Sequence, residues 1–245
     1  MDEIAVLAVV QARMSSSRLP GKVLETLGDS TVLARVVTAT SAASTVDRVV
    51  VATSTGRDDD PVVEEADRLG VAVVRGPEDD VLARFVAAID AYPCEWVVRI
   101  TADCPLLDPA IVDEVVAVAR SIPSCDHLTT DLRRHLPRGL DAEVSRADAL
   151  RRATAEAVDH HRSHVTTWFV EHPDRYVVRG LELPPDDGDL RVTLDTAEDL
   201  ALLRAVVAEL GAGPHHRRSV VELLRRRADL VGLNAGVRQK ALHLG

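Results

Sequence analysis

Four short apolar runs, each followed by a segment of helical periodicity, limit the folds open to the first half of this 245-residue chain. The runs cover residues 4–10, 46–52, 71–74 and 96–101, and helical spacing follows over 31–42, 61–69, 80–91 and from Pro109 onward. Strands and helices that alternate in this way form a parallel sheet with helices on both faces. We therefore predict an α/β fold, with Asp29 or Ser30 capping the first helix and Asp108 capping the helix at Pro109.

The alternation weakens after residue 121. Residues 125–145 indicate a strand, a polar excursion and a returning strand, and the elements expected after them are helices over 147–158 and 160–172, strands over 176–183 and 190–194, and a closing helix over 197–210. A polar break then precedes a final helix and a tail. The expected organisation is one domain over 1–210, with an arm inserted within about 122–190, and residues 211–245 as its C-terminal helix and tail.

Composition excludes several classes of protein. The formal charge is −10 and aromatic residues make up 2% of the chain, so the basic, aromatic surface of a nucleic-acid-binding protein is not expected. The longest apolar stretches are strand-sized and too short for a membrane span, so we expect a soluble, cytoplasmic protein. Cys94, Cys104 and Cys125 have no C-x-x-C spacing and indicate neither a disulfide framework nor a zinc knuckle.

The segment "QARMSSSRLPGKVL" (11–24) follows the first apolar run and gathers Arg13, Arg18 and Lys22. Like charges this close repel one another unless an anion lies between them. A loop after a strand of a parallel sheet lies where such folds bind ligands, and the hydroxyls of Ser15–Ser17 can cradle oxygens there. A triphosphate matches the charge. The loop lacks the glycine and hydroxyl positions of a Walker loop, and a solvated basic loop is the alternative.

Six segments occur in a fixed order along the chain: "VVQARMSSSRLPGKVL" (9–24), "VVRGPEDDVLARF" (73–85), "RITADCPLLDP" (99–109), "PRGLDAEV" (137–144), "HRSHVT" (161–166) and "RVTLDTAEDL" (191–200). Together they resemble the spore-coat-polysaccharide branch of the cytidylyltransferase family, which is similar to the 3-deoxy-manno-octulosonate and acylneuraminate cytidylyltransferases. The resemblance covers roughly residues 1–210. It implies a Rossmann-like nucleotidyltransferase fold, a three-layer sandwich with a mostly parallel mixed sheet, often dimeric through the late arm.

The resemblance also assigns catalytic roles. Arg13, Arg18 and Lys22 would hold the triphosphate, Asp103 and Asp195 would bind Mg²⁺, and Arg13, Lys22 and both aspartates would be catalytic. Both aspartates follow expected strands, so they should reach the same sheet edge as the first loop. The alternatives are that Asp103 is a turn residue and that Asp195 is a helix N-cap with Glu198 completing a capping box.

Base recognition is expected after the second and third strands. Ser15, Thr53 and Arg75 complete the predicted nucleotide-binding set, and Arg75 would point toward the base or a phosphate. A surface arginine is the alternative interpretation of Arg75.

The acceptor is expected near a second polar group of residues. The resemblance places Arg138, Asp141, Arg162 and His164 there, because two arginines can pair with a carboxylate or phosphonate and Asp141 or His164 could accept a proton from a hydroxyl. His160 and His164 also stand four residues apart, a spacing that can bind zinc, although no third ligand is evident in the sequence.

The predicted function is Mg²⁺-dependent transfer of CMP from CTP to an anionic acceptor, with release of pyrophosphate. The acceptor would be a sugar acid or a small phosphonate such as phosphonoformate, and the expected assembly is a homodimer. The alternatives are a nucleotide-sugar glycosyltransferase that uses an Asp-x-Asp motif at 58–60 or 187–189, and a non-catalytic nucleotide-binding module. The side chains leave CTP against UTP open.

Overall fold

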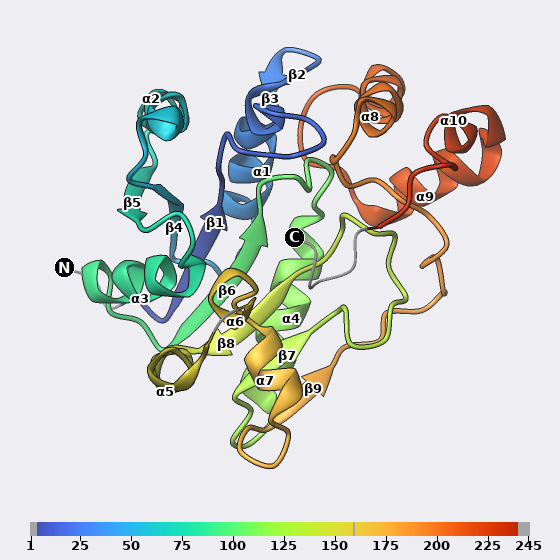
Figure 1. Cartoon of the computed structure of the whole chain (residues 1–245). Coiled ribbons are helices and arrows are strands. Elements are labelled where there is room, and N and C mark those ends of the chain that lie inside the picture. Colours follow the sequence, from blue (N-terminus) through green and yellow to red (C-terminus); the bar gives the residue numbers. More distant parts are fainter. Residues whose placement is uncertain (1–3, 159, 240–245) are drawn as a thin grey trace.

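A seven-stranded mixed sheet forms the middle of the molecule (Figure 1), seen in a computed structural model that describes residues 4–158 and 160–239. The strand order is β5-β4-β1-β6-β8-β7-β9. β8 runs antiparallel to both of its neighbours and the other pairings are parallel. The strands are β1 (Val6–Gln11), β4 (Arg48–Ser54), β5 (Ala72–Gly76), β6 (Trp96–Thr101), β7 (His127–Thr129), β8 (Glu143–Arg146) and β9 (Val178–Gly180), with β2 (Thr26–Leu27) and β3 (Ser30–Thr31) in a separate small sheet.

Helices cover both faces of the sheet, which makes the fold a three-layer sandwich as predicted. One face packs against α1 (Val32–Ser41), α2 (Asp60–Arg68), α4 (Pro109–Ser121), α8 (Ala197–Leu210), α9 (Arg217–Arg226) and α10 (Ala228–Gly232). The other packs against α3 (Val81–Ala91), α5 (Ala147–Glu156) and α7 (Thr167–Glu171), with the short α6 (His160–Ser163) beside them. Short 3₁₀ turns are η1 (Lys22–Leu24) and η2 (Arg57–Asp59).

The central strand β1 shows why its sequence is continuously apolar. Val6, Ala8 and Val10 belong to the core on one face, whereas Leu7 and Val9 belong to the core on the other. Because successive side chains of a strand point to opposite faces, a strand covered on both faces has no polar alternation. The predicted parallel sheet is confirmed by this register.

Two of the expected helix starts can be compared directly with the structure. The Asp108 side chain accepts a hydrogen bond from the backbone N–H of Ala110 (2.9 Å), so the predicted cap of α4 is confirmed. The cap predicted at Asp29 or Ser30 is wrong, because the hydroxyl of Thr31 accepts the bond from the Ala34 N–H (3.0 Å). Residues 29 and 30 belong to the β2–β3 hairpin, which precedes the helix.

The second half departs further from the prediction. The single helix expected over 160–172 is two helices, because the carbonyl of His164 accepts bonds from the N–H and the hydroxyl of Thr167. The strand expected over 190–194 is absent from the described structure, which has only an isolated bridge between Arg138 and Arg191. The backbone of residues 190–194 bonds to Arg138 at one end and to Asp103 at the other. It therefore has no single partner strand with which to form a ladder.

The segment expected to contain an arm, residues 122–190, supplies β7, β8 and β9 to the main sheet. The helices after residue 210 lie beside α8 (Figure 1), and the backbone N–H of Arg217 donates to the Asp108 carboxylate (2.7 Å), which joins the start of α9 to the start of α4. Across residues 4–158 and 160–239, no helix combines the length and apolarity needed to span a bilayer.

Gly139 closes the contact between the loop after β7 and the segment that leads to Asp195. It adopts a φ of +105°, and a Cβ there would lie 2.4 Å from the backbone nitrogen of Thr193. We expect Gly139→Ala to lower the free energy of unfolding by about 3 kcal/mol or more, since neither backbone can give way cheaply. Gly70→Ala is the matched control, because Gly70 has a φ of +69° but open space around it. Its cost should be about 1 kcal/mol, and equal losses in urea denaturation would contradict the close approach.

Candidate active site

A cavity of about 370 Å³ opens where β1 and β6 end and the first loop begins. Six stretches of the chain line it: the first loop, the end of β6, the start of α3, residues 163–164, Asp195 and Gln239. Its lining residues include Gln11, Arg13, Ser15, Arg18, Lys22, Arg84, Arg99, Asp103, Ser163, His164, Asp195 and Gln239. The cavity therefore lies at the carboxyl edge of the parallel strands, where open α/β sheets bind ligands.

Lys22 and the two predicted metal ligands meet at the floor of this cavity. The Nζ atom of Lys22 lies 2.7 Å from Oδ2 of Asp103 and 2.8 Å from Oδ1 of Asp195, and it also donates to the carbonyl of Leu194 (2.7 Å). The structure thus brings together two carboxylates that are far apart in sequence. Their oxygens already share one cation, which is the property a divalent ion site requires.

Backbone contacts hold the two aspartates in place. The N–H of Leu194 donates to the carbonyl of Asp103 (2.9 Å), so the segment before Asp195 is fastened directly to the turn after β6. The N-cap of α8 is Thr196, which forms a capping box with Asp199. The alternative cap made by Asp195 and Glu198 is therefore wrong, and the Asp195 carboxylate turns to the cavity instead.

The charges around Asp195 determine its ionisation. Burial alone would raise the pKa of Asp195, but Lys22, Arg191 and Arg18 outweigh it and lower the pKa to about 2. Arg18 and Arg191 lie 2.9 and 2.8 Å from its Oδ2. Burial likewise opposes the charged forms of Asp103 and Lys22, yet the ion pairs between them lower the pKa of Asp103 and raise that of Lys22. All three groups are charged at neutral pH.

Asp59, in the Asp-x-Asp run at 58–60, holds the backbone of the first loop in place. Asp59 is buried and its carboxylate accepts from the backbone N–H of Met14 (2.7 Å) and of Ser54 (3.0 Å). Asp59 therefore supports the backbone of the first loop and of the end of β4. The Ser15 hydroxyl donates to Glu78 (2.9 Å), which adds a second link across the loop.

Arg84 is a cavity residue that the sequence prediction missed. Its side chain is 2% exposed, and its Nε has no hydrogen-bond partner among the described residues. Burial lowers the pKa of Arg84, and the nearby charge of Arg13 lowers it further. The available signal was its place in α3, because Arg84 lies between Leu82 and Phe85 on the buried side of that helix. A cation on an apolar face indicates either a buried partner or a ligand.

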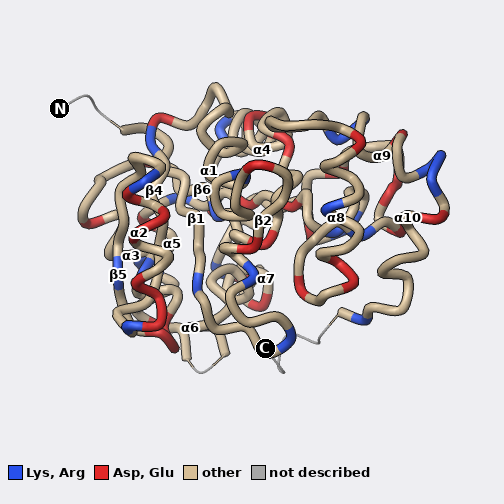
Figure 2. The backbone as a smooth tube through the Cα atoms, turned by 90° about the horizontal axis from the view of Figure 1, so that it is seen from above, with Lys and Arg blue, Asp and Glu red and all other residues tan. Residues whose placement is uncertain are grey.

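Arg99 is the second missed cation. Its guanidinium donates to Oε1 of Gln11 (2.9 Å) and to both oxygens of Glu143 (3.1 Å each), so its orientation in the cavity wall is held from two strands. With Arg13, Arg18, Lys22 and Arg84, the lining carries five cations and two carboxylates. Charges of both signs are interspersed over the rest of the molecule (Figure 2), and the chain as a whole is acidic. Such a local excess attracts anions.

Two residues predicted to bind the nucleotide have other positions. Thr53 is completely buried in β4 and is not part of the cavity lining. Arg75 donates to the carbonyls of Ser54 (2.7 Å) and Gly56 (2.8 Å) and pairs with Asp60 (2.8 Å), so it fastens the loop after β4. Thr53 and Arg75 thus lie outside the cavity lining, and their assignment to the nucleotide stays a prediction.

Of the predicted acceptor residues, His164 lines the cavity and the other three do not. Arg162 pairs with Asp80 (2.6 Å), the cap of α3. Asp141 binds Arg134 (2.7 Å) and the backbone of Gly139, and burial raises its pKa. Arg138 lies in the isolated bridge, outside the lining. The Arg162 and Asp141 side chains thus stabilise segments around the cavity.

The motif expected for a glycosyltransferase is engaged elsewhere. Asp187 and Asp189 both bind Arg225, at 2.8 and 2.6 Å, on the surface of the C-terminal helices. Asp59 serves the first loop, and Asp60 pairs with Arg75. Neither run lines the cavity, so the structure gives the glycosyltransferase alternative no metal site.

The fold and the site together define a nucleotidyltransferase. The sequence model of the family described as cytidylyltransferase matches residues 7–208, and the chain belongs to that family. It is an enzyme of the cytidylyltransferase class, and the resemblance seen in its sequence is confirmed.

Two relatives and one solved structure illustrate the similarity. The spore coat polysaccharide biosynthesis protein SpsF of Bacillus subtilis (strain 168) is 34% identical over 235 residues, 91% of this chain and 95% of that protein. A 3-deoxy-manno-octulosonate cytidylyltransferase of Solibacter usitatus (strain Ellin6076) is 36% identical over 118 residues, 45% of this chain and 43% of that enzyme. The structure of a cytidylyltransferase from Leptospira borgpetersenii serovar Hardjo-bovis (strain JB197) has a TM-score of 0.89 at 28% identity, covering 94% and 97% of the two chains.

Replacing Lys22 with methionine leaves Asp103 and Asp195 without their shared cation. We expect the free energy of unfolding to fall by about 3 kcal/mol at pH 7, because Asp103 then lies buried beside Asp195 without a paired cation, whereas Asp195 keeps Arg18 and Arg191. The folded-state pKa of Asp195 in the parent, about 2, lies below its ordinary value of 3.8. This stabilisation is therefore complete above about pH 4 and is lost as the pH falls toward 2.

The pH dependence separates this effect from simple loss of packing. In Lys22→Met the carboxylates protonate more easily, so the deficit in unfolding free energy should shrink below about pH 5. Urea denaturation from pH 3 to 8 measures it. Arg151→Met, which removes an exposed ion pair with Asp90, should change stability by less than about 1 kcal/mol. A deficit in Lys22→Met that is independent of pH would contradict the charge argument.

Proposed function

We propose that this enzyme transfers CMP from CTP to an anionic acceptor of the sugar-acid type, using Mg²⁺ and releasing pyrophosphate. The observation that carries the proposal is the contact of Lys22 with Asp103 and Asp195 on the floor of a cationic cavity. Membership of the cytidylyltransferase family supports CTP as the nucleotide.

The cations serve the triphosphate. In nucleotidyl transfer an acceptor oxygen attacks the α-phosphorus while the bond to the β-phosphate oxygen breaks, and negative charge develops on the departing pyrophosphate. Arg13, Arg18, Lys22 and Arg84 lie on the same cavity wall and would offset that charge. Because their positions are set by Asp59 and by the packing of α3, little reorganisation is needed when the nucleotide binds.

Asp103 and Asp195 are the groups that would hold Mg²⁺. They present carboxylate oxygens, the ligands that this ion prefers, and Lys22 already stands in as their cation. Bound magnesium would neutralise phosphate oxygens and orient them. Arg191 binds Asp195 and Asp199 together, and so maintains the direction of the Asp195 carboxylate.

The acceptor would lie against Arg99, Ser163 and His164. Arg99 lies in β6, Ser163 ends α6 and His164 follows it, and all three line the cavity. Arg99 offers a guanidinium to a carboxylate or phosphonate. An acceptor that attacks through an anionic oxygen needs no strong base, whereas a hydroxyl would give its proton to His164. Two relatives are named as a polysaccharide biosynthesis protein and a 3-deoxy-manno-octulosonate cytidylyltransferase. These names favour a sugar acid over a small phosphonate as the acceptor.

A substrate screen tests the proposed reaction. The four nucleoside triphosphates are each combined with sugar acids and small phosphonates, and pyrophosphate release is measured with and without Mg²⁺. We expect release with CTP, one acceptor and the metal together. Asp195→Asn should lose at least about 100-fold in turnover, because charge compensation is needed most in the transition state, while Asp90→Asn keeps full activity. Release by Asp195→Asn at the rate of Asp90→Asn would refute the assignment.

Arg84→Met separates a role in ligand binding from a role in folding. Removing a buried guanidinium whose Nε is unpaired should leave the stability of the nucleotide-free enzyme unchanged or raise it by about 1 kcal/mol. Affinity for CTP should nevertheless fall about 10-fold or more, and affinity for CMP less, because the cation meets the outer phosphates. Calorimetric titration and urea denaturation give both values. A loss of stability with unchanged CTP affinity would show that Arg84 is structural.

A further inference from the structure

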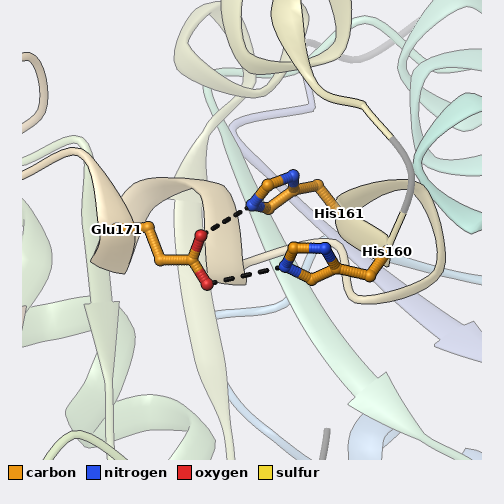
Figure 3. Close-up of side chains that lie close together, drawn as sticks. All are labelled: His160, His161 and Glu171. Carbon is orange, nitrogen blue, oxygen red and sulfur yellow. Dashed lines mark hydrogen bonds and ion pairs between the residues drawn. The ribbon is translucent and has the colours of Figure 1, made fainter. Parts of the chain in front are cut away.

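Three potential metal ligands meet outside the nucleotide cavity, between α6 and α7 (Figure 3). They are the ring nitrogens of His160 and His161 and the carboxylate of Glu171, and one ligand atom from each lies within 4.8 Å of the others. The sequence spacing had pointed to His160 with His164. The fold instead turns His164 to the cavity wall and brings Glu171, from the next helix, to His160.

Hydrogen bonding places one proton of His161 on Nδ1. Its Nδ1 lies 2.8 Å from the carbonyl oxygen of Val158, and since a carbonyl can only accept, Nδ1 carries a proton. The other nitrogen, Nε2, lies 2.8 Å from Oε2 of Glu171. In a neutral ring that is protonated at Nδ1, Nε2 carries a lone pair. The Nε2 atom and the carboxylate oxygen then both direct electron pairs at the space between them. A cation must lie between them, either a second proton on His161 or a metal ion.

His160 adds a third donor to that space. Its Nε2 lies 3.6 Å from the other oxygen of Glu171, and the two imidazole rings are 3.9 Å apart. Two protonated rings at this distance would repel each other, whereas two neutral rings around one divalent ion would not.

We propose that His160, His161 and Glu171 bind one divalent transition-metal ion of the zinc class, with solvent completing the coordination. Two imidazoles and one carboxylate are a donor set that zinc accepts. The donor atoms of a tetrahedral ion with bonds near 2.0–2.1 Å are about 3.3 Å apart, which falls inside the 2.8–4.8 Å range seen here. The bond from Nδ1 of His161 to a carbonyl is the outer-shell contact that orients a ligating imidazole.

The surroundings suit a bound ion that is reached from solvent. His161 is 6% exposed and packs edge-on against Trp168 (4.9 Å between ring centroids), and His172 stacks on that indole. This apolar wall strengthens the attraction between ion and donors. Glu171 and His160 are about half exposed, which leaves a path for the ion to enter.

Such an ion would clamp α6 to α7. The backbone N–H of His164 donates to the carbonyl of His160 (3.0 Å), and Ser163 and His164 form part of the cavity wall. Metal binding would therefore restrict the motion of Ser163 and His164 in the cavity wall. This inference does not depend on the nucleotide or on the reaction proposed above.

Cobalt and zinc titrations of the nucleotide-free enzyme test the site. The protein is first treated with a chelator, and excess Mg²⁺ is then added to occupy sites built from carboxylates alone. We expect one equivalent of Co²⁺ to bind with the visible absorption of a four-coordinate complex and to be displaced by Zn²⁺. Glu171→Gln and His161→Gln should each weaken binding by more than about 100-fold, since the loss of even an outer-shell partner costs 10–100-fold.

A matched histidine variant and a thermal measurement control the result. His216→Gln removes a histidine whose side chain is 80% exposed and outside the cluster, and it should bind cobalt as the parent does. Zn²⁺ should raise the melting temperature of the parent and of His216→Gln but not that of Glu171→Gln. Glu171 is half exposed, so its variant folds even if His161→Gln does not. Cobalt binding that survives Glu171→Gln, or no binding by the parent, would overturn the proposal and leave a proton between His161 and Glu171.

Discussion

The ammonium of Lys22, held between Asp103 and Asp195, is the contact on which the rest of the site depends. Two carboxylates this close and this buried repel each other unless a cation compensates them. By supplying that cation, the first loop ties itself to the turn after β6 and to the segment before α8. The cavity is the space left above these three joined segments, so the same contact that stabilises the fold also positions the groups proposed to bind Mg²⁺ and phosphate.

The remaining cations are held by the fold in two different ways. Arg13 and Arg18 lie on a loop whose backbone is fixed by Asp59, whereas Arg84 and Arg99 come from a helix and a strand and are oriented by packing and by Glu143. An acidic chain thereby concentrates positive charge in one concave place. This arrangement is typical of a protein that binds a polyanionic small molecule.

The sequence pattern best predicted which residues reach the cavity where those residues directly follow an apolar segment. The loop over 11–24 and Asp103 follow strands whose carboxyl ends meet at one edge of the parallel sheet. Asp195 follows an apolar segment that is not a strand, and the bond from the Leu194 N–H to the Asp103 carbonyl brings it to the same place. Which of the predicted acceptor residues line the cavity depends on contacts between segments that are distant in sequence. Arg162 is drawn to Asp80 and Asp141 to Arg134, partners that come from elements distant in sequence and are invisible to any local spacing.

The sequence by itself determined the layered α/β fold, the cationic first loop and the place of Asp103, because apolar periodicity and the position of a residue after a strand are local properties. Asp195 reaches the same place through the bond between Leu194 and Asp103. Tertiary structure alone decided that Arg84 and Arg99 enter the cavity, that Thr53 and Arg75 stay outside it, and that His160 meets His161 and Glu171 instead of His164. Each of these outcomes depends on which way a side chain points and on which distant charge it finds there, and both are fixed only when the helices pack against the sheet.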